Sequence, residues 1–322
     1  MSEETALKFW LHQLGCVASI VYYWVLSVLE KVTPLDWWPE KDVRGKTVLI
    51  TGAGRGFGRH FAIEFAKRGA NLVLWSRSEG PLVETKELVE GLGVKVLAAT
   101  VDISKRAEVH EAAEEAKSKF GHVDIVINNA AVCWAHCTAT LDPDELDSFI
   151  KTNFLSTHYV NHEFLPDMIE RDEGHIVAIC SASGIITIPF QTAYASSKFA
   201  LNAYMNCLHA ELQALKSNVK TTVISPYVTQ TEMTKDFKTS TVPRLLPDLT
   251  TDYVIHRGVH AILTDQTEVY IGRFWYLIKI FLACVPYASA YHFMRLIGLD
   301  GLLLQMVGNK IPQKLTNNNN VE

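Results

Sequence analysis

The sequence predicts an α/β fold in which helices cover both faces of a doubly wound parallel sheet. From about residue 45 onward, short apolar runs alternate with longer helical stretches, as expected of repeated βα units. A glycine-rich turn joins the first of these runs to the first helix. The chain has 322 residues, 48% of them apolar, which is enough for a large core. Its net charge of -5 argues against a nucleic-acid partner.

An apolar segment precedes this pattern. Phe9 to Leu29 is 21 residues long and carries no formal charge, so its length could span a bilayer. Glu3 and Glu4 lie before it and no small-residue cleavage site follows, which argues against a cleaved signal peptide. We therefore expect residues 1–40 to be a retained anchor that spans or lies in a membrane or lipid-droplet surface; a buried helix of a soluble protein is the alternative. More cations follow the segment than precede it, which places the rest of the chain in the cytosol.

The expected Rossmann-type domain covers residues 41–272. After its first strand, Phe57, Phe61 and Phe65 recur every four residues and Gly69 follows, which predicts a helix with one packing face and a defined end. The apolar runs predict strands at Lys46–Ile50, Asn71–Trp75, Val94–Ala99, Val123–Ile127, His175–Cys180 and Lys220–Ile224.

The turn between the first strand and the first helix predicts a phosphate site. Glycines here remove side chains, so that backbone N–H groups and the helix N-terminus can approach a pyrophosphate. The spacing is Thr-Gly-x-x-x-Gly-x-Gly, and its position in the first βα unit makes the signal specific. We expect cofactor contacts from Thr51, Gly52, Arg55, Gly56, Phe57 and Gly58.

The residues after the second strand favour NADP(H) over NAD(H). An NAD site places an acid there for the adenosine ribose, whereas this chain has Ser76 and Arg77. The Arg77 cation suits a 2′-phosphate and Arg55 could add a second; a solvated loop charge is the alternative for Arg77. Asp102 follows the third strand and could accept from the adenine amino group, or else cap a helix.

The predicted chemistry rests on Tyr194 and Lys198. Residues four apart share one helix face, so the Lys198 ammonium is expected to lower the pKa of the Tyr194 phenol towards neutral pH. Tyr194 could then exchange a proton with a substrate oxygen while a nicotinamide exchanges a hydride. Ser181, at the end of a predicted strand, is expected to hold that oxygen, and Asn153 is available from the preceding helix.

These residues resemble the short-chain dehydrogenase/reductase family over most of residues 45–270. The glycine turn is similar to the family's cofactor turn, and Asn128-Asn129-Ala130-Ala131 to its Asn-Asn-Ala-Gly motif. The resemblance implies that Asn153, Ser181, Tyr194 and Lys198 form an active-site tetrad, in which Lys198 binds the nicotinamide ribose and, with Asn153, holds a proton-relaying water. It also implies cofactor contacts from Asn129, Ala130, Pro226 and Thr231, whereas Tyr227 departs from the usual glycine.

Within the family, the chain resembles the membrane-associated retinol dehydrogenase and 17-beta-hydroxysteroid dehydrogenase-like group, including the short-chain retinal reductase type. The shared features are the apolar N-terminal segment, Gly54-Arg55-Gly56, the run Val73 to Arg77, and Thr231-Glu232-Met233. The resemblance implies a long lipophilic alcohol or carbonyl substrate, such as retinol and retinal, met on the endoplasmic reticulum or a lipid droplet. It also implies a homodimer. A hydroxysteroid substrate, a lipid-droplet coat or scaffold role, and an NADP(H) sensor without turnover are the alternatives.

Two later segments complete the predicted organisation. Residues 273–322 form an apolar helical extension with a polar tail, and Phe274–Val307 could lie on a membrane, cap the substrate pocket or pack as core. Thr231–Thr251 is expected to be a mobile lid over the substrate. Cys133 and Cys137 flank His136, but no second pair of zinc ligands with a short spacing lies nearby, so we expect core packing and no metal.

Overall fold

The structure, a computed structural model, describes residues 3–33, 37–229, 231, 249–272 and 275–296. Within the chain two compact units are distinguished, Met1–Lys41 and Asp42–Glu322. The first contains helix α1 (Glu3–Val32), whose large apolar side chains are exposed, among them Trp10, Leu14, Ile20 and Trp24. Among the helices that the structure describes, none combines the length and the hydropathy needed to cross a bilayer.

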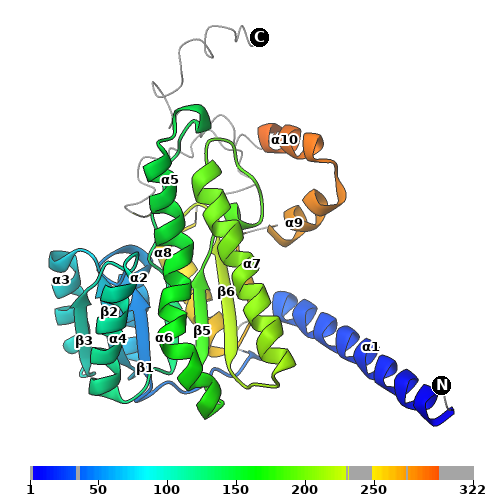
Figure 1. Ribbon diagram of the computed structural model, residues 1–322, viewed down its shortest axis with the longest axis horizontal. Coiled ribbons are helices and arrows are strands. Elements are labelled where there is room, and N and C mark those ends of the chain that lie inside the picture. Colours follow the sequence, from blue (N-terminus) through cyan, green and yellow to red (C-terminus); the bar gives the residue numbers. More distant parts are fainter. Residues whose placement is uncertain (1–2, 34–36, 230, 232–248, 273–274, 297–322) are drawn as a thin grey trace, which may run out of the picture. The chain divides into compact units, whose positions relative to one another are not determined.

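The second unit is built on a seven-stranded sheet in which every pair of neighbouring strands is parallel (Figure 1). Its strand order is β3-β2-β1-β4-β5-β6-β7, which confirms the predicted doubly wound parallel sheet. The strands are β1 (Thr47–Thr51), β2 (Asn71–Ser76), β3 (Val96–Thr100), β4 (Ile125–Asn128), β5 (His175–Ile179), β6 (Lys220–Pro226) and β7 (Glu268–Ile271). The sequence patterns did not predict β7. Strand β6 extends past its predicted end because Ser225 and Pro226 pair with β7.

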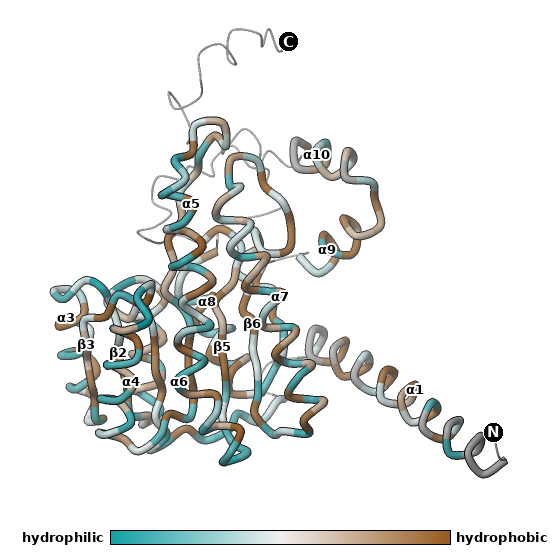
Figure 2. Tube along the Cα trace, viewed as in Figure 1, coloured by the Kyte–Doolittle hydropathy of each residue, from teal (hydrophilic) through white to brown (hydrophobic). Residues whose placement is uncertain are grey.

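Helices cover both faces of this sheet, as predicted (Figure 1). They are α2 (Gly56–Lys67), α3 (Glu79–Glu90), α4 (Arg106–Phe120), α5 (Pro143–Ile150), α6 (Ser156–Arg171), α7 (Thr192–Ala214) and α8 (Thr251–Leu263). Alternate residues of β1 serve opposite cores: Val48 and Ile50 pack with α2, α3 and α8, whereas Leu49 packs with α4, α6 and α7. Figure 2 shows the resulting hydrophobic strands between helices with hydrophilic outer turns.

The glycine turn is positioned by the helix that follows it. Phe61 and Phe65 of α2 are fully buried against the sheet, while Phe57 packs at the edge of the same core. Gly69 takes the left-handed conformation just after the helix ends, as its place in the sequence predicts. The N-terminus of α2 is therefore fixed at the carboxyl end of β1.

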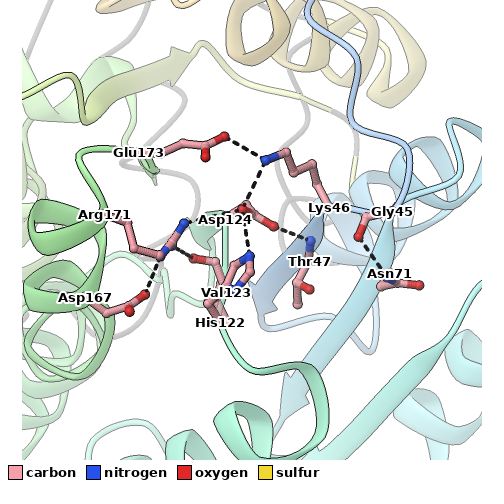
Figure 3. Close-up of polar contacts among 10 residues, drawn as sticks. All are labelled: Gly45, Lys46, Thr47, Asn71, His122, Val123, Asp124, Asp167, Arg171 and Glu173. Carbon is pink, nitrogen blue, oxygen red and sulfur yellow. Dashed lines mark hydrogen bonds and ion pairs between the residues drawn. The ribbon is translucent and has the colours of Figure 1, made fainter.

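A buried carboxylate joins the amino-terminal ends of the two central strands, β1 and β4 (Figure 3). Asp124, at the start of β4, accepts a hydrogen bond of 2.8 Å from the Thr47 N–H at the start of β1. Its other oxygen lies 3.5 Å from Lys46 Nζ and 3.8 Å from Nη1 of Arg171, at the end of α6. His122 Nε2 is 3.4 Å away. Because these partners converge on one buried group, the central strands and α6 keep a common register.

The C-terminal extension begins with α9 (Trp275–Cys284) and α10 (Tyr287–Leu296). Trp275 and Ile278 of α9 are buried in the core, whereas Leu277 and Ile280 of the same helix are exposed. The predicted polar tail, and the predicted lid apart from its ends, lie outside the described residues.

Candidate active site

A cavity of about 700 Å³ opens at the carboxyl ends of the strands. This is where a doubly wound sheet binds ligands, because the strand order reverses there between β1 and β4. The cavity brings together most of the predicted site residues: Gly52, Arg55, Gly56, Phe57, Ser76, Arg77, Asp102, Asn129, Ala130, Ser181, Tyr194, Lys198, Pro226 and Thr231.

The glycine turn forms a cradle without room for side chains. Gly52 and Gly56 have positive φ angles of 68° and 53°. A Cβ on Gly58 would lie 2.2 Å from the Gly52 carbonyl oxygen, and one on Gly52 would lie 2.9 Å from Ala130 Cα. Helix α2 begins at Gly56 and directs its N-terminus at the cavity. The backbone N–H groups and the positive end of the helix dipole therefore fit a pyrophosphate.

Thr51 and Gly58 support this cradle from outside the cavity lining. Thr51 Oγ1 accepts hydrogen bonds from the Asn129 and Ala130 N–H groups, at 3.0 and 3.1 Å. The Asn129 side chain in turn donates to the Thr51 carbonyl oxygen at 2.8 Å. The Thr51 hydroxyl thus joins the loops after β1 and β4. A direct contact of Thr51 with the cofactor stays a prediction.

The end of β2 presents cations and hydroxyls to the cavity. Arg77 is exposed and makes no hydrogen bond or ion pair with another residue that the structure describes. Arg55 Nη2 donates to Ser78 Oγ at 3.3 Å. Asp102 also lines the cavity, and its Oδ1 accepts from the N–H and hydroxyl of Ser104. It closes a turn and does not cap α4, which begins at Arg106.

Ser181, Tyr194 and Lys198 meet on the inner wall. Ser181 follows β5, Tyr194 lies in the first turn of α7, and both line the cavity. Lys198 is buried one turn later; its Nζ lies 5.9 Å from the centre of the Tyr194 ring and donates to the Ile179 carbonyl oxygen at 2.9 Å. A phenol and a serine hydroxyl that face one cavity can together hold a carbonyl oxygen.

Asn153 lies behind the wall, outside the cavity lining. It belongs to a π-helical turn, Lys151–Leu155, between α5 and α6. Its Oδ1 accepts from the Val132 N–H at 2.8 Å, and its Nδ2 donates to the Val132 carbonyl at 2.9 Å and to Ser197 Oγ at 3.1 Å. The side chain thus fixes the backbone of the loop after β4, whose next residues line the cavity.

Burial sets the protonation of the Tyr194 and Lys198 pair. Desolvation raises the pKa of the Tyr194 phenol well above 10, although the hydrogen bond with Ser181 opposes this. Desolvation also lowers the pKa of the Lys198 ammonium. For the chain without a cofactor, the direction of the Tyr194 pKa is therefore opposite to the expected lowering, because burial raises it. The tyrosine is a neutral phenol, the form that can donate a proton.

The cavity lining also includes residues that were not assigned to the site from the sequence, among them Cys133, Trp134, Ser183, Gln191 and Tyr227. Cys133 and Trp134 follow the Asn-Asn-Ala-Ala strand end, which is the one signal that could have placed them. Burial raises the pKa of Cys133 to about 12, so the thiol is not a ready nucleophile. Of the rejected zinc candidates, Cys137 is buried and His136 Nδ1 lies 3.4 Å from Glu145.

Comparison with known proteins finds a matching family profile, similar sequences and similar solved structures. The family profile described as short chain dehydrogenase matches residues 46–241. Estradiol 17-beta-dehydrogenase 11 of Pongo abelii is 41% identical over 72% of this chain and 76% of its own length. Epidermal retinol dehydrogenase 2 of Mus musculus is 34% identical over 89% of this chain and 93% of its own length. A short chain dehydrogenase/reductase from Burkholderia phymatum, solved with NAD, shares the fold with a TM-score of 0.68 and a sequence identity of 24%. The match covers 75% of this chain and 94% of that structure's chain.

Proposed function

Because this chain belongs to the short-chain dehydrogenase/reductase family, we propose that it is an NADP(H)-dependent oxidoreductase for a lipophilic alcohol and its carbonyl. The observation that supports this most directly is the meeting of Ser181, Tyr194 and Lys198 in the cavity that also holds the glycine cradle. Retinol and retinal, or similar long-chain lipids, are the proposed substrates.

The proposed mechanism assigns one task to each residue. When bound in the cradle, NADPH supplies the hydride. The hydroxyls of Ser181 and Tyr194 hold the carbonyl oxygen, and the neutral Tyr194 phenol gives it a proton as the carbon receives the hydride. Lys198, with a water held by Asn153, returns a proton to Tyr194. One hydride and one proton convert the carbonyl to an alcohol, and the charges balance.

Arg77 is the proposed determinant of cofactor preference. Among Ser76, Arg77 and Ser78, which line the cavity after β2, there is no carboxylate to hold an unphosphorylated ribose. Arg77 is unpaired among the described residues and can give a 2′-phosphate two parallel hydrogen bonds, with Arg55 as a second cation. We expect Arg77→Asp to reverse the preference from NADPH towards NADH.

The proposed surroundings are a membrane or lipid-droplet surface facing the cytosol, with the endoplasmic reticulum as the source membrane. Helix α1 supports this because tryptophans and leucines along it are exposed. We assign residues 1–40 to the anchor, 41–272 to the catalytic domain and 273–322 to the apolar extension. Pairing of two copies through α6 and α7 remains the proposed assembly. The relative named estradiol 17-beta-dehydrogenase 11 supports a hydroxysteroid substrate as the second candidate.

The experiment that tests this function measures NADPH and NADH oxidation by the vesicle-reconstituted protein. All-trans-retinal, a long-chain aldehyde and a 17-keto steroid are compared with wild type, Tyr194→Phe and Arg77→Asp. Tyr194-dependent turnover that prefers NADPH, and loses this preference in Arg77→Asp, supports the proposal and ranks the lipid classes. NADPH binding without Tyr194-dependent turnover of any of them would contradict it and favour the scaffold or sensor alternatives.

A further inference from the structure

One buried polar side chain in the cavity has no role in the chemistry proposed above. Gln191 precedes α7 directly and lines the same cavity as Ser181 and Tyr194, yet only 5% of its surface is exposed. A carboxamide carries two N–H donors and an acceptor oxygen, all of which cost free energy when they are buried without partners.

Only the oxygen end of this carboxamide is engaged. Gln191 Oε1 accepts a hydrogen bond of 2.8 Å from Ser183 Oγ. Within the part of the chain that the structure describes, Gln191 Nε2 has no hydrogen-bond partner. The atom is not completely buried, because it keeps some accessible surface. Gln191 is a lining residue of the cavity, and Nε2 is the end of its carboxamide that no described residue engages.

The backbone holds the carboxamide in a fixed place. Phe190, just before it, has a φ of +62°, which is rare for an aromatic residue. The Phe190 carbonyl oxygen accepts from the His136 N–H at 2.8 Å, and the Gln191 carbonyl oxygen accepts from the Ala195 N–H at 2.7 Å. Backbone hydrogen bonds therefore hold the main chain at Phe190 and Gln191, three residues before Tyr194.

A single residue links this carboxamide to the proposed oxygen site. Ser183 donates its N–H to Ser181 Oγ at 3.1 Å and its hydroxyl to Gln191 Oε1. Gln191 is thus close to the position where Ser181 and Tyr194 would hold the reacting oxygen. Val132, Trp134 and Ile188 make other parts of the lining apolar, so the free amide N–H groups stand out as a directional polar contact.

We propose that Gln191 determines substrate specificity by donating a hydrogen bond to a second oxygen of the substrate, placed a few bonds from the reacting carbon. This inference rests on the proposed function and narrows it. The preferred substrate is then a lipid carbonyl that carries a neighbouring hydroxyl, ether or keto oxygen. Retinal and simple aldehydes, which have one oxygen, stay substrates under the proposed function, but they leave the amide unpaired and are turned over with a lower kcat/KM.

The test compares ketones that differ only in the second oxygen. Long-chain methyl ketones with a methoxy group on the α or β carbon are paired with their ethyl isosteres, because an ether oxygen can only accept a hydrogen bond. We expect the wild type to favour either the α-methoxy or the β-methoxy ketone over its ethyl isostere by about tenfold or more in kcat/KM. Gln191→Leu should abolish this preference. Gln191→Glu should abolish it at a pH where the carboxylate is ionised, because it then keeps an acceptor for Ser183 but has no donor.

Controls separate this inference from the proposed function. Gln213→Leu makes the same substitution at an exposed position of α7 and should keep the preference. Binding of the same ketones to NADPH-loaded Tyr194→Phe, by calorimetry, reads out Gln191 without any turnover. Equal binding and turnover of methoxy ketones and isosteres, or a preference that survives in Gln191→Leu, overturns the role of Gln191. Gln191-dependent binding without turnover in the wild type overturns the proposed function alone.

Discussion

At the scale of single residues, the phenol of Tyr194 carries the proposed proton transfer. Tyr194→Phe removes one hydroxyl from a buried ring and leaves its packing intact, so we expect kcat to fall by about 10² to 10⁴ with little change in NADPH affinity. Turnover and fluorescence titration with NADPH measure the two effects. Tyr204→Phe deletes a hydroxyl on the same helix outside the cavity lining and is the matched control. Unchanged turnover in Tyr194→Phe would remove the tyrosine from the mechanism.

The raised pKa of Tyr194 also predicts how the two reaction directions depend on pH. Carbonyl reduction needs the protonated phenol, which persists at every pH below its raised pKa, so kcat for reduction should be flat from about pH 6 to 8. Alcohol oxidation needs the phenolate, and its kcat should rise by about tenfold per pH unit below that pKa. Stopped-flow measurement of both directions checks this. A reduction rate that falls steeply between pH 6 and 8 would be inconsistent with a neutral phenol.

At the scale of elements, the cradle between β1 and α2 depends on close approach of two backbones. Gly58→Ala would place a Cβ 2.2 Å from the Gly52 carbonyl oxygen, so we expect a loss of about 1–3 kcal/mol in the free energy of unfolding and weaker NADPH binding. Gly80→Ala, in the first turn of α3, meets nothing within 4 Å and should be neutral or stabilising. Denaturant unfolding of both variants measures the difference. Equal stabilities would mean that the turn can open without cost.

The same elements show what can be read from sequence. The six predicted strands and the glycine turn were found because period, composition and turn chemistry are local signals. Strand β7 was missed from the sequence, and the structure shows it at the end of the sheet, where it pairs with β6. The place of Asn153 behind the wall depends on a π-helical turn that no pattern marks. Gln191 lines the cavity next to Phe190, whose positive φ no sequence pattern marks.

At the scale of the whole molecule, the two compact units predict separable properties. Removal of residues 1–40 should abolish flotation with phospholipid vesicles, because the exposed apolar side chains of α1 are lost. Turnover of a short, soluble carbonyl should be retained, because the cavity residues all belong to the second unit. Density-gradient flotation and steady-state kinetics test both halves. Vesicle binding that survives the deletion would move the lipid contact to another segment, such as the exposed face of α9.

The position of β1 between β2 and β4 has a consequence for the order in which the protein matures on the ribosome. The first three strands emerge before β4, yet the cradle is locked by Asn129 and Ala130, which donate to Thr51 from 78 and 79 residues downstream. Asp124, which holds the start of β1, arrives at the same stage. A nascent chain that displays the complete glycine turn therefore still lacks the hydrogen bonds that hold its cradle. Cofactor binding is then expected late in biosynthesis, once β4 has paired with β1 in the middle of the sheet.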